Sequence, residues 1–425
     1  MCNVYSCNKK FTFIIIVAII LVVSILFFDI NKNNYVINKN YVFATNDKEG
    51  EKKEKFEEEL NNNIDNILGD IDTEELDEFI ENDFSLEFLN SFSFLDLVKK
   101  VLSNDLFNEY NSLFLGITNY FKDNFKSLLL FFFTLFSIII LNEMFASFCV
   151  DKYGEIKKVV NLIFSLILVV LILYLVKDLY EEILGVVNKI FNFSKTLFPM
   201  LLGLILLSGS NGTFTSYTTL STFLIETGSY LFLYIIIPIV SSIVTLQILN
   251  IIFKDNKFSK LISLLKTIFK YIIVSFFAVF GLFSMINIVT SGTADGVNYK
   301  LTKFAIKSYI PVLGGYISDG FDFVHTCSVL VKNSFGICGI IVLFFIILQP
   351  ILHCVIYIIL FKVLAVFISF IGKQKYANYF DSVSSGISYL ISVLVGIFMC
   401  SFVFIYLLIM SVSVVWWFIN LFILL

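Results

Sequence analysis

The sequence contains no arginine, because all 30 of its basic residues are lysines. A bidentate guanidinium clamp on phosphate or carboxylate is therefore excluded, which disfavours phosphoryl-transfer chemistry. Charge is scarce as well: 15% of the 425 residues are charged, whereas 58% are hydrophobic. A soluble globular chain is about half apolar and about a quarter charged. With a mean hydropathy of +0.88, the composition predicts that lipid is the solvent for much of the chain.

Cysteine and histidine are also few. None of the seven cysteines lies between residues 29 and 126, which excludes a disulfide-stapled domain in this acidic part of the chain. Two histidines without clustered cysteines offer almost nothing to a metal ion. No nucleophile–base pair, phosphate-binding loop or dinucleotide fingerprint is present. We therefore expect no enzyme activity, no catalytic, cofactor-binding or metal-binding residues, no cofactor and no nucleic-acid partner.

The charges are distributed unevenly along the chain. Residues 29–126 hold 22 acidic residues against 10 lysines, a net charge of −12, and the remainder holds 12 against 20, a net charge of +8. Such asymmetry usually separates compartments. Residues 1–28 carry Lys9 and Lys10 ahead of an apolar run, which predicts a signal peptide, the favoured alternative, or a signal anchor. Both alternatives place residues 29–126 outside the cytoplasm.

This acidic region divides into two parts. The charged stretch Asn46–Asp83 is expected to be partly disordered. Between Phe84 and Phe125, apolar residues recur at helical spacing and predict an amphipathic helix. The members of this apolar stripe are Phe88, Phe92, Leu95, Val98, Leu102 and Leu106. The stripe lies on the membrane or on the protein's own spans in one interpretation, and binds a partner in the other.

Residues 127–176 predict the first two transmembrane helices. Ser127–Ala146 and Val159–Val176 are each close to the ~20 residues needed to cross a bilayer. Three lysines in the connection at 151–158 place it in the cytoplasm by the positive-inside rule, which places Lys177–Thr196 outside again. The whole pattern predicts an all-α polytopic membrane protein with six to eight transmembrane helices.

Proline occurs only four times, in two pairs of equal spacing. Pro199 and Pro238 are 39 residues apart, as are Pro311 and Pro350, and the two pairs are offset by 112 residues. The hydropathy pattern repeats at the same offset. The spacing predicts a duplicated membrane unit, with chance spacing as the alternative. The predicted parts are repeat 1 at 195–290, repeat 2 at 307–411 and an apolar tail at 412–425.

The orientation of the two repeats stays open at this point. They are parallel if the short apolar pieces at Pro199 and Pro311 dip into the membrane and return, and inverted if these pieces cross. In the parallel case the basic loops Lys254–Lys270 and Lys373–Asp381 both face the cytoplasm. Loops on opposite sides would indicate inverted repeats.

The second repeat contains an unusually long apolar segment. Phe335–Ile371 would be ~55 Å long as one helix, against a hydrocarbon core of ~30 Å. It must therefore break at Pro350, tilt steeply or form a hairpin. Proline-bent helices in duplicated units build solute sites in transporters, which suggests a permease for a small solute.

Four polar residues lie within or beside the predicted spans. Glu143 and Glu226 are near enough to a helix end for an interfacial, structural role. Gln349 and His353 flank Pro350 on one helical face and predict a hydrogen bond between helices.

Four stretches closely resemble the stage III sporulation protein AE family. They are SFSFLDLVKK at 91–100, LFPMLLGLILLSG at 197–209, SGTADGVNYKLTKFAIKSYIPVLGGYISD at 291–319 and CSVLVKNSFGICG at 327–339. The likeness runs from about residue 84 to 411, and its most specific part is Ala294–Asp319. The candidate functional or packing positions are Pro199, Pro238, Asp295, Pro311, Gly314, Gly315, Asp319, Lys332, Asn333, Gly336 and Pro350.

The resemblance implies a multi-pass component of a channel complex that forms during sporulation. The complex would lie in the mother-cell membrane that faces the engulfed forespore and would sustain late forespore development. The partners would be membrane lipid, other subunits of the stage III complex and the forespore channel protein, with an unidentified small solute as a further candidate. Residues 29–126 would lie in the space between the two membranes, and the resemblance implies no catalytic residue.

Overall fold

A computed structural model gives the fold of the chain. It describes residues 64, 66–69, 71–83, 93–102, 129–145, 154–252, 257–309 and 314–424, without most side chains of 289–322 and those of 412–424. The chain divides into two units, Met1–Asn66 and Ile67–Leu425, and the helices below belong to the second. The described residues are almost entirely helical and include no β-strand, which confirms the predicted all-α class. The predicted signal segment lies outside them.

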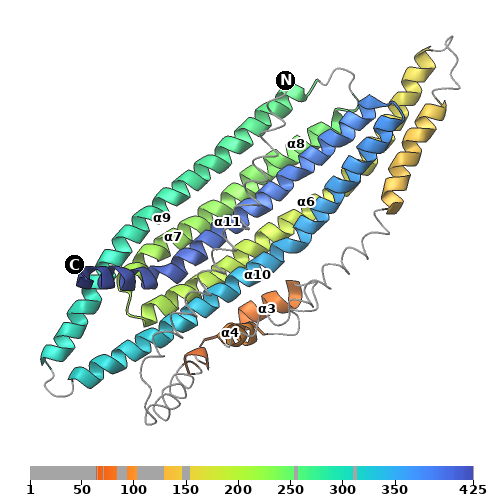
Figure 1. Cartoon of the computed structure of the whole chain (residues 1–425). Helices are drawn as coiled ribbons and strands as arrows, with labels where there is room; N and C mark the ends of the chain where they lie inside the picture. Colours follow the sequence, from red (N-terminus) through yellow and green to blue (C-terminus); the bar gives the residue numbers. More distant parts are fainter. Residues whose placement is uncertain are drawn as a thin grey trace. The chain divides into compact units, whose positions relative to one another are not determined.

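Five long helical segments form the membrane half (Figure 1). They are α6 (Gly154–Leu207), the continuous series α7 (Asn211–Tyr230), η3 (Leu231–Ile236) and α8 (Ile237–Leu249), α9 (Ser259–Tyr309), α10 (Gly314–Phe370) and α11 (Gln374–Leu424). Each segment is long and apolar enough to cross a membrane, which confirms the prediction of a membrane protein. A shorter apolar helix, Leu129–Phe145, lies within the first predicted span. The number of spans in the whole chain stays a prediction.

Helix α6 is longer than the sequence pattern suggested. It joins the second predicted span, Val159–Val176, to the polar segment Lys177–Thr196 and to the short apolar piece after it, over a length of about 80 Å. No glycine-rich or proline-rich break separates these parts, and the ion pair between Lys177 and Glu181, at 3.3 Å, has the i,i+4 spacing that supports a helix. The drop in hydropathy at Lys177 therefore does not mark a loop, because the helix continues through it.

Two glycines end long helices in tight turns. Gly209 follows α6 with a φ of 81°, and Gly372 follows α10 with a φ of 84°. In both cases the N–H of the next residue, Ser210 or Lys373, donates to the carbonyl five residues earlier, at 3.3 Å. Glycine adopts this left-handed conformation without strain. The short turns make consecutive helices antiparallel neighbours.

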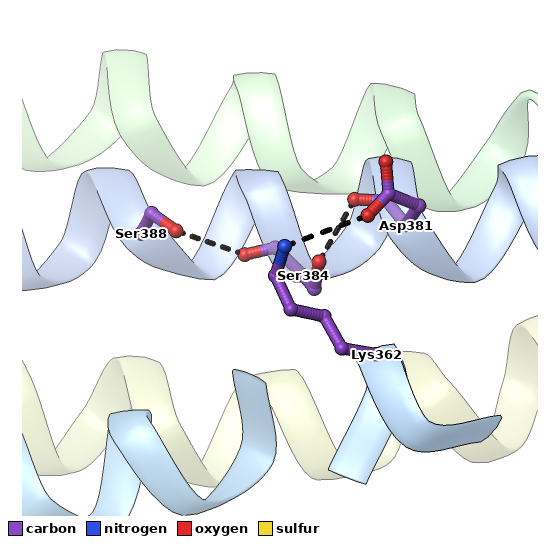
Figure 2. A network of polar contacts seen from close by, with 4 residues as sticks. All are labelled: Lys362, Asp381, Ser384 and Ser388. Carbon is purple, nitrogen blue, oxygen red and sulfur yellow. Dashed lines mark hydrogen bonds and ion pairs between the residues drawn. The ribbon is translucent and has the colours of Figure 1, made fainter. Parts of the chain in front are cut away.

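Helices α10 and α11 run antiparallel and share the most extensive interface in the described residues. Phe361 and Phe380 stack across it with ring centroids 5.9 Å apart. Figure 2 shows Lys362 of α10 beside Asp381 of α11, at 3.6 Å. The hydroxyl of Ser384 donates to the Asp381 carbonyl at 2.9 Å, so this serine satisfies its hydrogen bonding within its own helix.

The end of α8 and the start of α9 lie beside the first turns of α11. A Cβ placed on Gly386 would overlap the side-chain oxygen of Gln247 in α8. Phe269 of α9 lies 5.4 Å from Tyr389 of α11, edge to face. The C-terminal end of α8, which follows Pro238, and the C-terminal end of α10, which follows Pro350, are therefore at the same end of the bundle. The parallel arrangement of the repeats requires this. The duplication itself stays a prediction.

The described prolines have different surroundings. Pro199 and Pro350 lie inside the continuous helices α6 and α10. Of the three alternatives for Phe335–Ile371, the break and the hairpin are therefore wrong, and the steep tilt stays a prediction. A proline removes a single backbone donor, and α6 and α11 contact α10 on both sides of residue 350. Pro238, near the start of α8, follows the π-helical turn η3. Pro311 lies outside the described residues.

Part of the acidic region is folded. The expected partial disorder does not extend to α3 (Glu74–Asp83), whose Leu76 and Ile80 are fully buried one turn apart. This helix packs on α6, where the rings of Phe79 and Phe193 lie 5.9 Å apart. Amphipathic spacing therefore overrides the high charge of the segment.

Helix α4 (Phe94–Leu102) forms the described part of the predicted amphipathic helix. Its buried residues are Phe94, Leu97 and Val98. Phe94 lies 5.4 Å from Phe335 of α10, so α4 rests on the protein's own membrane helices. Of the described stripe residues only Val98 is buried, whereas Leu95 and Leu102 are partly exposed. The stripe residues Phe88, Phe92 and Leu106 lie outside the described residues.

Candidate functional site

Lys332 of α10 is fully buried, with 0% of its surface exposed. Its Nζ donates to the backbone carbonyls of Leu408 and Ile409 in α11, both at 2.9 Å. Among the described residues, no carboxylate lies within ion-pair distance of it. A buried ammonium carries a desolvation penalty of several kcal/mol, so peptide dipoles supply the compensation that a carboxylate usually gives.

Gly336 explains why the two helices approach closely enough for this contact. It lies one turn after Lys332, on the same side of α10. A Cβ at Gly336 would lie 2.6 Å from Cγ1 of Ile409, closer than van der Waals contact allows. The missing side chain lets the backbone of α11 approach α10, as small residues do in membrane helix pairs. Lys332 and Gly336 therefore act as one unit, in which the glycine sets the separation that the lysine spans.

Two further helices meet α10 within two turns of Lys332. Phe335 contacts Phe94 of α4, and Leu197 of α6 occupies the space beside Gly339. Phe198 of α6 lies 4.4 Å from Phe404 of α11. The structure thus brings together three of the sequence stretches noted above, 91–100, 197–209 and 327–339. We call the junction of α4, α6, α10 and α11 around Lys332 the lysine junction.

Asn333 is the second polar candidate here. Its Oδ1 is buried, and it has no hydrogen-bond partner among the described residues. A buried amide oxygen without a partner carries an energetic penalty unless water or another chain supplies a donor. The side chain is therefore available to a group outside the described residues.

The remaining sequence candidates are spread over other parts of the fold. Asp295 lies in α9, and Gly314, Gly315 and Asp319 lie in the first two turns of α10; the structure describes the backbone of these four residues only. Pro199 is next to the lysine junction on α6, whereas Pro238 and Pro350 are remote from it in α8 and α10. The described side chains bring together Lys332, Asn333 and Gly336.

Comparison with known proteins covers all of this junction. A family model described as stage III sporulation protein AE matches residues 92–413, more than half of the chain. The chain belongs to the stage III sporulation protein AE family. A protein named stage III sporulation protein AE from Bacillus subtilis (strain 168) is 24% identical over 243 residues, which cover 57% of this chain and 61% of the relative. The chain therefore spans less than two thirds of that relative's length. No solved structure matches.

Family membership confirms the recognition made from the sequence and places the chain among stage III sporulation proteins. The family match begins two residues before α4 and ends four residues after Ile409 in α11, so it includes every residue named in the lysine junction. Neither match names an enzyme.

Sequence reasoning did not foresee the partner of His353 in this family member. His353 Nδ1 of α10 lies 2.6 Å from Glu182 Oε2 of α6, and both side chains are about three-quarters buried. The predicted hydrogen bond between helices is confirmed for His353, but its partner was not foreseen. Glu182 lay in a segment expected to be outside the membrane, and no spacing signal links two residues so distant in the chain.

Glu143 has the structural role expected for it. Its carboxylate lies 2.5 Å from Nζ of Lys373 at the turn between α10 and α11. The neighbouring Asn142 donates to the hydroxyl of Tyr376 at 2.9 Å. The helix Leu129–Phe145 is thereby fixed to the start of α11. Glu226, the other acidic candidate, is exposed on α7.

Charge reversal tests the contact between Glu143 and Lys373. We expect Glu143→Lys or Lys373→Glu alone to lower the stability of the solubilised protein by about 1 kcal/mol, because partly exposed pairs contribute no more. The combined reversal should recover most of the loss. Thermal unfolding in detergent measures both effects. Charge reversal of the more exposed pair Lys177 and Glu181 serves as the control, and it should change the stability less than reversal at Glu143 or Lys373. A double variant whose loss equals the sum of the single losses would contradict the pairing.

Proposed function

We propose that this chain is a polytopic membrane component of the sporulation channel complex that links the mother cell and the forespore, and that late forespore development needs it. The observation that carries the proposal is the family match over residues 92–413. Five helical segments able to cross a membrane support a place within the lipid bilayer. The protein would reside in the mother-cell membrane that faces the forespore.

The acidic region supports contacts in the space between the two membranes. Residues 29–126 would lie there, and α3 has the exposed carboxylates Glu74 and Glu78. Because α3 and α4 are packed on α6 and α10, a partner that binds these helices would also contact the membrane bundle. The proposed partners are the other subunits of the stage III complex and the forespore channel protein.

Deletion of this chain in its spore-forming host tests the proposal. Expression of a late forespore reporter should fall to the level of a strain that lacks the whole complex, because the missing subunit would interrupt the connection. A mother-cell reporter should stay normal until that stage and serves as the control. Normal late forespore expression and normal spore yield in the deletion strain would refute the proposed function.

A transporter-like permease that moves a small solute through the repeat interface is the second candidate. It is favoured by the buried ammonium of Lys332, since ionisable groups within membrane bundles mark substrate or ion paths. The π-helical turn before Pro238 is a second feature frequent at functional sites. Both functions hold together if the subunit moves a solute within the larger complex.

Single substitutions separate the two candidates. The residues to replace are Asp295, Asp319, Lys332 and Asn333, each followed by separate measurements of complex assembly and of solute passage. Lost passage with intact assembly would support the permease. Lost assembly in every case would support the structural role and would remove the reason for proposing a solute path.

A further inference from the structure

One face of α6 exposes polar side chains at alternating spacings of three and four residues. The members are Asp178, Glu181, Asn188, Asn192 and Lys195, with Gly185 between the second and the third. We call these residues the α6 polar stripe. The alternating spacing keeps every member on one side of the helix.

The opposite face of α6 fixes the depth of this stripe. Phe191, between Asn188 and Asn192, is buried and lies 6.5 Å from Phe232 of η3. Phe232 in turn lies 5.6 Å from Phe276 of α9, edge to face. The two asparagines are therefore at the level of the central apolar part of α9.

Helix α9 exposes apolar side chains at the same depth. Tyr271, Val279 and Leu282 lie within two turns of Phe276, and Leu282 is 62% exposed. Such a surface suits lipid. The side chains at this level are the amides of Asn188 and Asn192, which are unfavourable in hydrocarbon unless all their polar atoms are hydrogen-bonded. Polar residues at such a depth face a bundle interior or water. The α6 polar stripe and the α9 surface therefore need different surroundings at one depth.

The position of α3 is a second, independent sign of water beside α6. Glu75 of α3 accepts a hydrogen bond from the hydroxyl of Thr196 at 3.1 Å, next to the last member of the stripe. The exposed carboxylates of Glu74 and Glu78 belong to the same short helix. A helix with this charge packs beside α6 only where water reaches it.

We infer that the α6 polar stripe lines a water-filled passage for hydrated ions or small polar solutes. The stripe carries two carboxylates, one ammonium and two neutral amides, so it favours neither sign of charge strongly. The carboxylates lie near the pair of Glu182 and His353, and the ammonium lies near α3. The inference deepens the function proposed above by naming the route through this subunit, and it relies on that function only for the direction of passage between the two cells.

Cysteine accessibility tests the passage in the full-length chain. The variants are Asn188→Cys and Asn192→Cys, reconstituted in sealed phosphatidylcholine–phosphatidylglycerol vesicles and treated with a charged, membrane-impermeant thiosulfonate reagent. Leu282→Cys is the matched control, because it is exposed at similar depth on the lipid-facing helix. The unsubstituted chain gives the background, and its four described cysteines, Cys327, Cys338, Cys354 and Cys400, are buried.

We expect both asparagine variants to react at least tenfold faster than Leu282→Cys. Equal, slow reaction at all three positions would overturn the inference, because it would place the stripe in lipid. Fast reaction in the isolated chain that disappears in the assembled complex would overturn it too, by showing a protein interface. Elution of each variant as a single species confirms folding before labelling. The vesicle measurement does not depend on the forespore reporter, so failure of the passage and failure of the proposed function are distinguishable.

Discussion

Lys332→Glu is expected to prevent stable folding of the membrane half, whereas Lys332→Met is expected to leave it folded. The glutamate would place a buried carboxylate against the two carbonyl oxygens that now accept from the ammonium. An uncompensated buried charge destabilises by about 3–5 kcal/mol. Methionine fills a similar volume without charge, and replacement of buried ions by apolar residues is often neutral or stabilising. Thermal unfolding in detergent and yield of the monodisperse protein measure both outcomes.

Lys362 on the same helix supplies the control for this prediction. Its side chain is half exposed, and its pair with Asp381 spans 3.6 Å. Lys362→Glu is therefore expected to change stability by about 1 kcal/mol or less, since surface pairs are weak and screened. Equal losses for Lys332→Glu and Lys362→Glu would contradict the buried environment of Lys332. A folded Lys332→Met protein that fails to restore sporulation would show that the charge itself has a function.

Gly336→Leu is expected to separate α10 from α11 at the lysine junction. The first added carbon would already lie 2.6 Å from the side chain of Ile409, and the rest of the leucine would push further into α11. Overpacking of this kind costs about 1–3 kcal/mol, and the separation would also lengthen the hydrogen bonds of Lys332. Thermal unfolding of the purified protein should therefore show a clear loss of stability.

Gly320→Leu in the same helix is the matched control, because nothing lies within 4 Å of a Cβ at that position. It should be neutral or slightly stabilising, since glycine lowers helix stability by about 1 kcal/mol. Ile409→Ala should recover part of the loss caused by Gly336→Leu, because it removes the opposing atoms. Absence of coupling between positions 336 and 409 would contradict the close approach of the two helices.

Composition was sufficient to predict the class of this protein, because no aqueous core could bury so many apolar residues. The resembling stretches also directed attention to Lys332, Asn333 and Gly336, which the structure brings to one junction. The partner of Lys332 could not be predicted, since peptide carbonyls have no residue-type signature. The pairing of Glu182 with His353 was missed for a different reason: it depends on the register between α6 and α10, which hydropathy does not encode.

Two expectations about helix ends were wrong for physical reasons. The predicted span Val159–Val176 was expected to end before Lys177, yet the helix continues through Lys177–Thr196 to Leu207. Pro350 resembled a break, yet contacts to neighbouring helices keep α10 continuous through it. Neighbouring helices account for the continuity at Pro350, whereas the absence of a glycine-rich or proline-rich break accounts for it at Lys177–Thr196.

The contact of Lys332 with backbone carbonyls also constrains how this pair of helices can evolve. Every amino acid has a carbonyl, so no substitution at Leu408 or Ile409 can delete the acceptors. The lysine can be lost by one codon change, whereas its two partners are supplied by whichever residues occupy those positions. Across related sequences we therefore expect no correlated changes between the lysine position and positions 408 and 409, because the carbonyl acceptors are the same whichever residues stand there.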